Sequence, residues 1–234
     1  MDLELETDVK EEVIAYLSQF VTAPRRRRMD KVLAWRTRHL TVALEDVYQP
    51  HNASAVLRSC EIFGVQDVHV VEGTNRFRPN KDVALGASQW LTLRHYRGDA
   101  GESTACCLRQ LKARGYRIAA TTLQEDATAL SDLSLDRPLA LVFGTEEEGL
   151  SQEAHELADT FLQLPMFGFT QSFNVSVTVA LCLYDLTRRL RASEVPWQLS
   201  DQEKRDLKLK WLIRSTERGE LLVRRFLRER EEGG

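Results

Sequence analysis

The sequence has no long hydrophobic run and no basic leader, and these absences exclude two classes of protein. No uninterrupted apolar stretch approaches the roughly 18 residues that a membrane helix needs. The N-terminal segment MDLELETDVKEEV is acidic, whereas secretory and mitochondrial targeting segments are basic. We therefore expect a cytoplasmic protein.

Cysteine and the common catalytic motifs are also scarce. The four cysteines are Cys60, Cys106, Cys107 and Cys182. They lie in apolar or helix-like stretches and form no CxxC pair, so we expect reduced thiols that pack in the interior and bind no metal. The sequence contains no GxGxxG, GxxxxGK[ST], HExxH or GxSxG motif. Dinucleotide-binding enzymes, P-loop NTPases, zinc hydrolases and typical serine hydrolases are therefore disfavoured.

Charge is distributed unevenly along the chain. The 234 residues carry a net charge of −3, yet residues 41–185 contain 11 Lys or Arg against 19 Asp or Glu. Residues 24–40 contain seven basic residues and one acid, and residues 186–234 contain 13 basic residues against 9 acids. This pattern suits an acidic core for small-molecule chemistry with basic flanks that bind a polyanion, and solvated helix faces are the alternative.

Strand-like and helix-like segments alternate between residues 40 and 191, which predicts an α/β fold with a mostly parallel sheet and flanking helices. The expected strands are 40–47, 67–73, 90–96, 116–123, 139–144 and 161–165, and the expected helices are about 53–63, 102–114, 151–158 and 173–191. Asn52 stands at the N-cap position of the first helix, and Gly64 follows its last periodic residue.

The C-terminal residues 200–231 have the pattern of one charged amphipathic helix. Its apolar stripe must pack on another element and consists of Leu207, Trp211, Ile213, Leu221, Leu222, Phe226 and Leu227.

Three polar clusters follow predicted strands and form the candidate site. The first, residues 50–60, contains Asn52 and Arg58, which are six residues apart and so do not share one helix face. The planar guanidinium of Arg58 suits a phosphate or a carboxylate, and a salt bridge to Glu61 or Glu45 is the alternative.

The second cluster, residues 143–151, is an acidic turn in which Gly144 lets a ligand approach the backbone and Ser151 caps the next helix. Its three glutamates disfavour a phosphate but tolerate a cationic ligand. The third cluster, residues 164–177, places Ser172, Asn174 and Ser176 at the start of an apolar helix. These side chains are either simple caps or part of a pocket for an adenine ring and a polar amino-acid tail.

In this order and spacing, NASAVLR, LALVFGTEEEGLS and LPMFGFTQSFNVSVTVALCLYDL resemble the three motifs of the SPOUT class of S-adenosylmethionine-dependent RNA 2′-O-methyltransferases. The resemblance spans about residues 40–190. The PHN opening, the VHVVEG strand and GASQWL are similar to the TrmH type within that class, which methylates the D-loop guanosine at tRNA position 18. The two helical extensions also suit this type, because the N-terminal one is too short for the substrate-binding domain of the ribosomal RNA relatives.

The resemblance implies a deep trefoil knot at about residues 138–190 and a homodimer whose active sites form where the two knots meet. It also implies three parts: a basic helical extension (1–39), the methyltransferase core (40–192) and a second basic helical extension (193–234).

The resemblance assigns roles to individual residues. The catalytic set is Arg58, Asn52, Glu146, Ser172 and Asn174, and the residues around S-adenosyl-L-methionine are Thr121, Gly144, Leu164, Met166 and Phe173. Contacts to tRNA phosphates are expected from Arg25, Arg26, Arg27, Arg28, Lys204, Arg205, Lys208 and Lys210. Two departures concern the pocket and RNA docking: Phe173 stands where leucine is commoner, and Glu147 and Glu148 replace a mixed basic and aromatic pair.

The implied reaction transfers a sulfonium methyl to a ribose 2′-hydroxyl, and the resemblance assigns activation of that hydroxyl to Arg58. Because arginine effectively never deprotonates in proteins, the alternative is that Arg58 holds the adjacent phosphate and stabilises developing alkoxide charge.

Other functions stay open at this point. A ribosomal RNA target or another tRNA position would use the same site. The complete catalytic set argues against a silent RNA-binding relative, and the basic flanks argue against an enzyme that acts on a small molecule.

Overall fold

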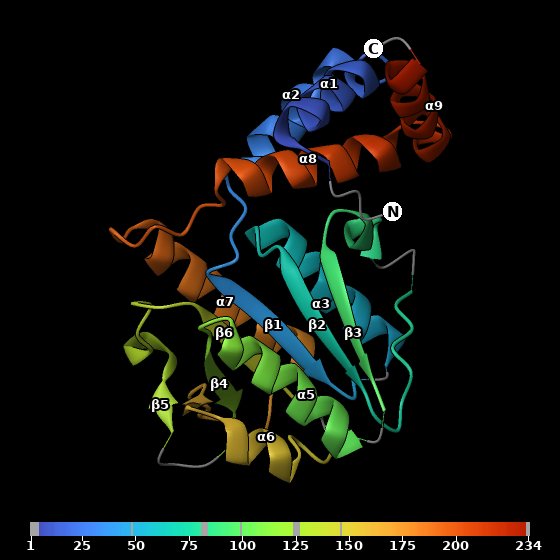
Figure 1. Cartoon of the computed structure of the whole chain (residues 1–234). Helices are drawn as coiled ribbons and strands as arrows, with labels where there is room; N and C mark the ends of the chain where they lie inside the picture. The colour runs from blue at the N-terminus through green and yellow to red at the C-terminus, as the bar shows by residue number, and fades with distance from the viewer. Residues whose placement is uncertain are drawn as a thin grey trace. The chain divides into compact units, whose positions relative to one another are not determined.

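The computed structural model describes residues 5–47, 49–80, 84–98, 100–123, 127–145 and 147–232. Its contacts divide the chain into two compact units (Figure 1). One unit joins the described residues up to Arg36 with those from Gln198 onward, and the other extends from Thr37 to Trp197. The N-terminal and C-terminal extensions, which are separate segments in the sequence, therefore pack together as one unit.

The described part of the terminal unit forms four helices: α1 (Thr7–Ser18), α2 (Ala23–Leu33), α8 (Asp201–Ser215) and α9 (Gly219–Glu232). Pro24 fits the first turn of α2, where no backbone N–H is needed, and Ser200 caps α8 through a capping box with Glu203. The predicted apolar stripe begins at Leu207 and Trp211, and both residues are buried.

The prediction of a single helix over residues 200–231 is wrong, because one helix ends at Ser215 and the next begins at Gly219. Arg218 has a φ of 54°, and a Cβ on Gly219 would lie 2.2 Å from the Ile213 carbonyl oxygen. The turn requires a left-handed backbone conformation at Arg218 and a close approach between the backbones of Gly219 and Ile213. Hydrophobic periodicity reveals neither feature.

The larger unit contains one sheet in which every described strand pairing is parallel, in the order β3-β2-β1-β6-β4-β7-β5. The strands are β1 (Leu40–Glu45), β2 (Asp67–Glu72), β3 (Thr92–Arg97), β4 (Arg117–Thr121), β5 (Thr128–Ala129), β6 (Leu139–Phe143) and β7 (Thr160–Gln163). Within the described residues of this unit, the helices are α3 (Pro50–Phe63), α5 (Ala100–Ala113), α6 (Gln152–Leu157) and α7 (Val175–Arg191), with two 3-10 turns, η1 (Ala87–Gln89) and η2 (Leu130–Asp132). The six predicted strands are confirmed within a few residues, and the two-residue β5 was not predicted.

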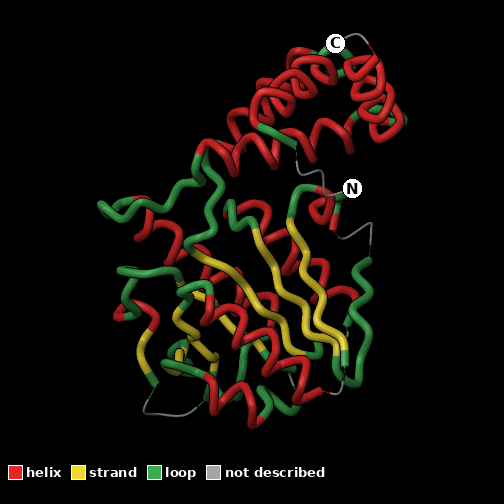
Figure 2. Tube along the Cα trace, viewed as in Figure 1, coloured by secondary structure: helices red, strands yellow, loops and turns green. Residues whose placement is uncertain are grey.

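Helices cover both faces of this sheet, so the larger unit has three layers (Figure 2). Val42 and Leu44 of β1 pack in the core beneath α3 and α7, whereas Ala43 belongs to the core beneath α5 and α6. This alternation follows from the two-residue period of a strand. Three of the cysteines pack in the interior as expected, but Cys106 on α5 is exposed.

In the part of the chain that the structure describes, every helix is too short or too polar to span a bilayer.

Candidate active site

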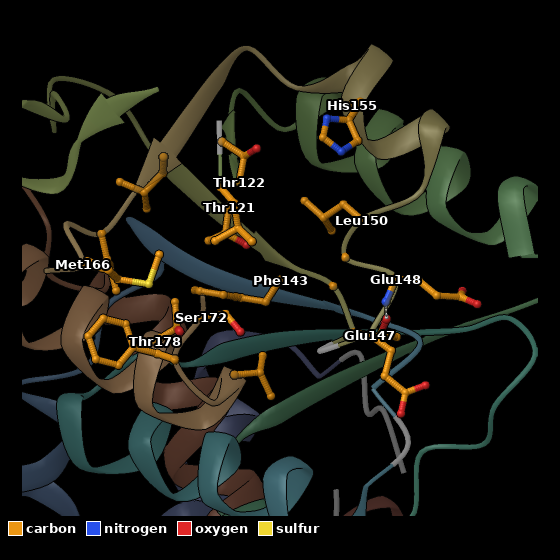
Figure 3. A pocket seen from close by; sticks show the side chains of 18 residues that line it. Thr121, Thr122, Phe143, Glu147, Glu148, Leu150, His155, Met166, Ser172 and Thr178 are labelled. Atoms are coloured by element: carbon orange, nitrogen blue, oxygen red, sulfur yellow. Dashed lines mark hydrogen bonds between the residues drawn. The ribbon is translucent and has the colours of Figure 1, made fainter. Parts of the chain in front are cut away.

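A cavity of about 510 Å³ lies at the carboxyl ends of three neighbouring strands, β6, β4 and β7 (Figure 3). Its lining consists of Thr121, Thr122, Leu123, Phe143, Gly144, Thr145, Glu147, Glu148, Gly149, Leu150, His155, Leu162, Leu164, Met166, Ser172, Phe173, Val175 and Thr178. In parallel α/β sheets this edge is where ligands bind. The volume is within the usual range for small-molecule sites.

The five residues that the sequence analysis placed around a cofactor all line this cavity, namely Thr121, Gly144, Leu164, Met166 and Phe173. Ser172, from the predicted catalytic set, lines it too, and the lining also includes seven further residues of the second and third predicted clusters: Phe143, Thr145, Glu147, Glu148, Gly149, Leu150 and Val175. The lining residues outside the predicted clusters are Thr122, Leu123, His155, Leu162 and Thr178. His155 is the clearest omission. It stands on α6 and stacks on Phe161 with ring centroids 5.4 Å apart, and no motif identifies it.

The lining combines an apolar wall with a few polar groups. Leu162, Leu164 and Met166 follow or end β7, and the Thr121 hydroxyl donates a hydrogen bond to the Val142 carbonyl at 3.0 Å. The Ser172 hydroxyl makes no hydrogen bond with the described part of the chain. A planar apolar ligand with a polar end therefore matches the chemistry of the lining.

Asn52 and Asn174 meet beside this cavity. Asn174 is the N-cap of α7, where its Oδ1 accepts a hydrogen bond from the Ser176 N–H at 2.9 Å. Its Nδ2 donates to Asn52 Oδ1 at 3.0 Å, and Asn52 Nδ2 donates to Gln49 Oε1 at 2.8 Å. Two segments 122 residues apart in the sequence are thus joined by one side-chain hydrogen bond.

The prediction that Asn52 caps the first helix is wrong. The helix α3 begins at Pro50, with Gln49 as its N-cap, so Asn52 lies inside the first turn and is buried. Proline fits the first turn because its missing N–H is not required there. Gly64, in the left-handed conformation, ends the helix as predicted, and Ser151 caps α6 as predicted by accepting a hydrogen bond from the Ala154 N–H.

Gly144 serves the loop itself, a role that the sequence analysis did not give it. A Cβ at this position would lie 2.0 Å from the Gly149 carbonyl oxygen. The loop closes through two hydrogen bonds, from the Thr145 N–H to the Gly149 oxygen at 3.0 Å and from the Gly149 N–H to the Thr145 oxygen at 3.2 Å. Any larger residue at position 144 would force this wall of the cavity apart.

The acidic turn contributes less to the cavity centre than its charge suggests. Figure 3 shows the Glu147 and Glu148 side chains directed away from the centre of the cavity, although both residues line it. Glu146, which the sequence analysis placed in the catalytic set, lies outside the described residues.

Arg58 does not line the cavity. Its side chain is exposed on α3 and makes no hydrogen bond or ion pair with the described part of the chain. The predicted alternative of a salt bridge to Glu61 or Glu45 is therefore wrong. Glu45 accepts its hydrogen bonds from Thr104 and Ser151 instead.

The basic residues of α8 and α2 differ in their ion pairs. Three cations of α8 form ion pairs: Lys204 with Asp201, Arg205 with Glu11, and Lys208 with Asp30. On α2, Arg26, Arg27, Arg28 and Lys31 form no ion pair with the described residues. Arg36 is fully buried and lies over the Trp211 ring at 5.4 Å.

The parallel sheet, the covered faces and the cavity at the strand ends define a three-layer α/β protein with a site suited to a small ligand. Residues 39–184 match the model of the SpoU rRNA Methylase family. The chain belongs to this family, and the resemblance inferred from its three motifs is confirmed.

Relatives with known names share most of the chain. The tRNA (guanosine(18)-2′-O)-methyltransferase of Borreliella burgdorferi is 43% identical over 198 residues, covering 85% of this chain and 88% of the relative. A solved TrmH/SpoU tRNA modifying enzyme from A. aeolicus superimposes with a TM-score of 0.73 at 28% identity, covering 82% of this chain and 96% of that one. The SpoU methyltransferase AviRb from Streptomyces viridochromogenes, solved with AdoMet, shares the fold at 21% identity, with a TM-score of 0.57 and coverage of 70% and 65%.

Proposed function

We propose that the chain is an S-adenosylmethionine-dependent tRNA (guanosine(18)-2′-O)-methyltransferase that methylates the ribose 2′-hydroxyl of the D-loop guanosine. The observation that carries this proposal is the 43% identity to a relative of that name, over most of both chains. The match covers 85% of this chain, so it is longer than the 39–184 region that matches the family model.

We infer that the cavity binds S-adenosyl-L-methionine, because its lining fits the parts of that molecule. The apolar side chains of Leu162, Leu164, Met166 and Phe173 suit an adenine ring, and the Ser172 hydroxyl is available to a polar group. When bound, the cofactor supplies an electrophilic methyl group on a sulfonium. The chain's own residues then have to hold the acceptor in line, exclude water and stabilise charge.

Arg58 is proposed to act on the acceptor RNA. Its exposed, unpartnered guanidinium is suited to a bidentate contact with the phosphate next to the target ribose and to stabilising developing negative charge. A general-base role is disfavoured because arginine keeps its proton at neutral pH. Asn52 and Asn174, with Glu146 and Ser172, complete the proposed catalytic set.

We further propose that tRNA contacts the α2 cations more than those of α8. The cations of α8 that pair within the unit would have to give up acids to bind phosphate, whereas Arg26, Arg27, Arg28 and Lys31 would not. Arg25 and Lys210 already interact with other residues of the chain, so the absence of an ion pair does not single them out. They remain predicted contacts to tRNA.

A homodimer is proposed through the outer face of α7. Val177, Leu181 and Tyr184 are 43%, 41% and 60% exposed and follow the i, i+4, i+7 spacing of one helix face. Ile62, at the end of α3, is 63% exposed, and its neighbour Phe63 lies against Tyr184 with ring centroids 6.4 Å apart. Solvated apolar faces of this kind mark protein interfaces. The trefoil knot at residues 138–190 is proposed with it, as part of the same family architecture.

A ribosomal RNA target is the second candidate, because the description of the matching family model names rRNA. The site chemistry is the same for both RNAs, so only the acceptor distinguishes them.

The test is transfer of labelled methyl from S-adenosylmethionine to unmodified bulk tRNA and, separately, to rRNA, with nuclease mapping of the product. We expect 2′-O-methylguanosine in the tRNA D-loop. Arg58→Ala should reduce transfer by on the order of 10²–10³-fold, and Arg58→Lys should restore little because lysine lacks the bidentate fork. Arg109→Ala, an exposed arginine on α5, is the matched control and should retain activity. Label in rRNA alone would overturn the substrate, and no transfer to either RNA would overturn the proposal.

A further inference from the structure

Glu45 is a buried acid that the proposed reaction does not use. It is the last residue of β1 and is 6% exposed. Its Oε2 accepts a hydrogen bond from the Ser151 backbone N–H at 2.8 Å, and its Oε1 accepts one from the Ser151 hydroxyl at 2.6 Å. The Thr104 hydroxyl of α5 also donates to Oε1. Three donors from two distant segments therefore converge on one side chain.

All three donors are neutral, and Glu45 forms no ion pair with the described part of the chain. A buried acid without a cationic partner is tolerated only where hydrogen bonds satisfy its oxygens, so the positions of the donors are strictly constrained. Hydrogen bonds to a charged acceptor are also roughly twice as strong as neutral ones. Glu45 therefore fixes Ser151 firmly against the end of β1.

Ser151 closes the loop that forms one wall of the cavity. Thr145, Glu147, Glu148, Gly149 and Leu150 all line the cavity and lie between β6 and Ser151. At the start of this loop, Phe143 of β6 pairs with Leu44 of β1. At its end, Ser151 bonds Glu45, the next residue of β1. The two ends of the loop are therefore held beside two consecutive residues of β1: its start lies beside Leu44 and its end beside Glu45.

We propose that Glu45 is a positioning residue for S-adenosylmethionine: through Ser151 it holds the described cavity-lining residues 147–150 against the end of β1 and so sets the shape of this cavity wall. This inference rests on the proposed function, because it assigns the cavity to that cofactor. Glu45 is not among the residues that line the cavity. It acts through Ser151, and its effect falls on cofactor affinity and leaves the contacts to tRNA phosphates unchanged.

The test is Glu45→Gln, which keeps the size of the side chain but turns an amide N–H toward a hydrogen-bond donor. We expect the Kd for S-adenosylmethionine, measured by titration calorimetry, to rise by roughly 10-fold or more. The KM for the cofactor should rise with it, whereas kcat at saturating cofactor and the Kd for tRNA should stay within about twofold of the wild type, since no phosphate contact is lost.

Asp67→Asn is the matched control, because it also removes a buried acid from a strand. Asp67 is the first residue of β2, so it lies at the amino ends of the strands, whereas the cavity lies at their carboxyl ends. Its carboxylate forms an ion pair with Arg38 at 3.1 Å. A purely structural role for Glu45 predicts that both variants lose thermal stability while the folded fraction of each binds cofactor normally.

Ser151→Ala provides a second variant if Glu45→Gln folds poorly. The proposal requires Ser151→Ala to weaken cofactor binding, and the double variant to weaken it by less than the product of the two single effects. Unchanged cofactor affinity in Glu45→Gln, or equal weakening in Asp67→Asn, overturns this inference while the proposed function stands. A wild-type protein that methylates no RNA and binds no S-adenosylmethionine overturns both.

Discussion

Single polar residues in and beside the cavity make hydrogen bonds within the protein that stabilise the fold, independently of any ligand. Asn174 caps α7 and donates to Asn52, and the Thr121 hydroxyl donates to a strand carbonyl. Replacing Asn174 would remove a helix cap, which alone costs about 1 kcal/mol. Activity losses at such positions therefore measure site geometry and local stability together.

His69 makes the stability of the larger unit depend on pH. It lies in β2, is 1% exposed, and its Nδ1 forms a hydrogen bond with the Tyr96 hydroxyl at 2.9 Å. Burial lowers the pKa of His69 from 6.5 to about 4. Between these two values the unfolded chain binds a proton that the folded chain does not, so stability falls as the pH decreases through this window. We expect a loss of up to roughly 3 kcal/mol in the free energy of unfolding.

Urea unfolding at a series of pH values from 7 to 4 measures this loss. His69→Gln should flatten the curve in part, because burial also lowers the pKa of His39 and that residue adds a loss of the same sign. His51→Gln, at an exposed position, should leave the curve unchanged. Equal curves for the wild type and His69→Gln would contradict the prediction.

Residue-level predictions from the sequence succeeded where the signal is local. Gly64 and Ser151 act on the turn in which they stand, so composition identifies them. The prediction for Asn52 failed because Pro50 starts the helix earlier. The alternative of a salt bridge from Arg58 to Glu61 or Glu45 is wrong as well, and the hydrogen bonds of Glu45 come from the distant residues Thr104 and Ser151, which no local pattern identifies. The five residues that the family resemblance predicts around a cofactor all line one cavity. His155 also lines it, but no motif contains this residue, so the sequence did not predict it.

At the level of helices and strands, hydrophobic pattern predicted most elements of the larger unit but not the four-helix terminal unit. The strands are short apolar runs between turn residues, which sequence alone reveals. The break at Arg218 and Gly219 lacks a proline, and the amphipathic period continues on both sides of it. Which helices pack together is set by contacts between opposite ends of the chain, and no local pattern encodes that choice.

The difference between α2 and α8 gives a prediction about salt. Replacing Arg26, Arg27 and Arg28 together with alanine should weaken tRNA binding and lower the slope of log Kd against log salt by about 2–3 if each contacts one phosphate. Lys204→Ala with Lys208→Ala should change the slope less, because these residues already pair with Asp201 and Asp30.

Filter binding of tRNA at several salt concentrations measures both slopes. Thermal unfolding of the two multiple variants serves as the control, since loss of the Lys208 ion pair removes a contact between α8 and α2. A slope that changes equally in both variants would contradict the distinction between the two helices.

For the whole molecule, the outer face of α7 predicts the oligomeric state. Val177→Asp with Leu181→Asp should convert a dimer to a monomer, because two charges would be buried at the centre of an apolar interface. Sedimentation equilibrium measures this change. Leu221→Asp, at a leucine of α9 that is 58% exposed, is the matched control and should stay dimeric. A monomeric wild type, or a dimeric double variant, would contradict the prediction.

The joining of both chain ends into one unit has a consequence for synthesis on the ribosome. The apolar sides of α1 and α2, including Val13, Leu17, Met29 and Leu33, are buried in the finished protein. Their partners α8 and α9 are translated only after the intervening unit from Thr37 to Trp197, which takes on the order of 10 s. During that delay the apolar residues of α1 and α2 have been synthesised before the two helices that cover them in the folded protein.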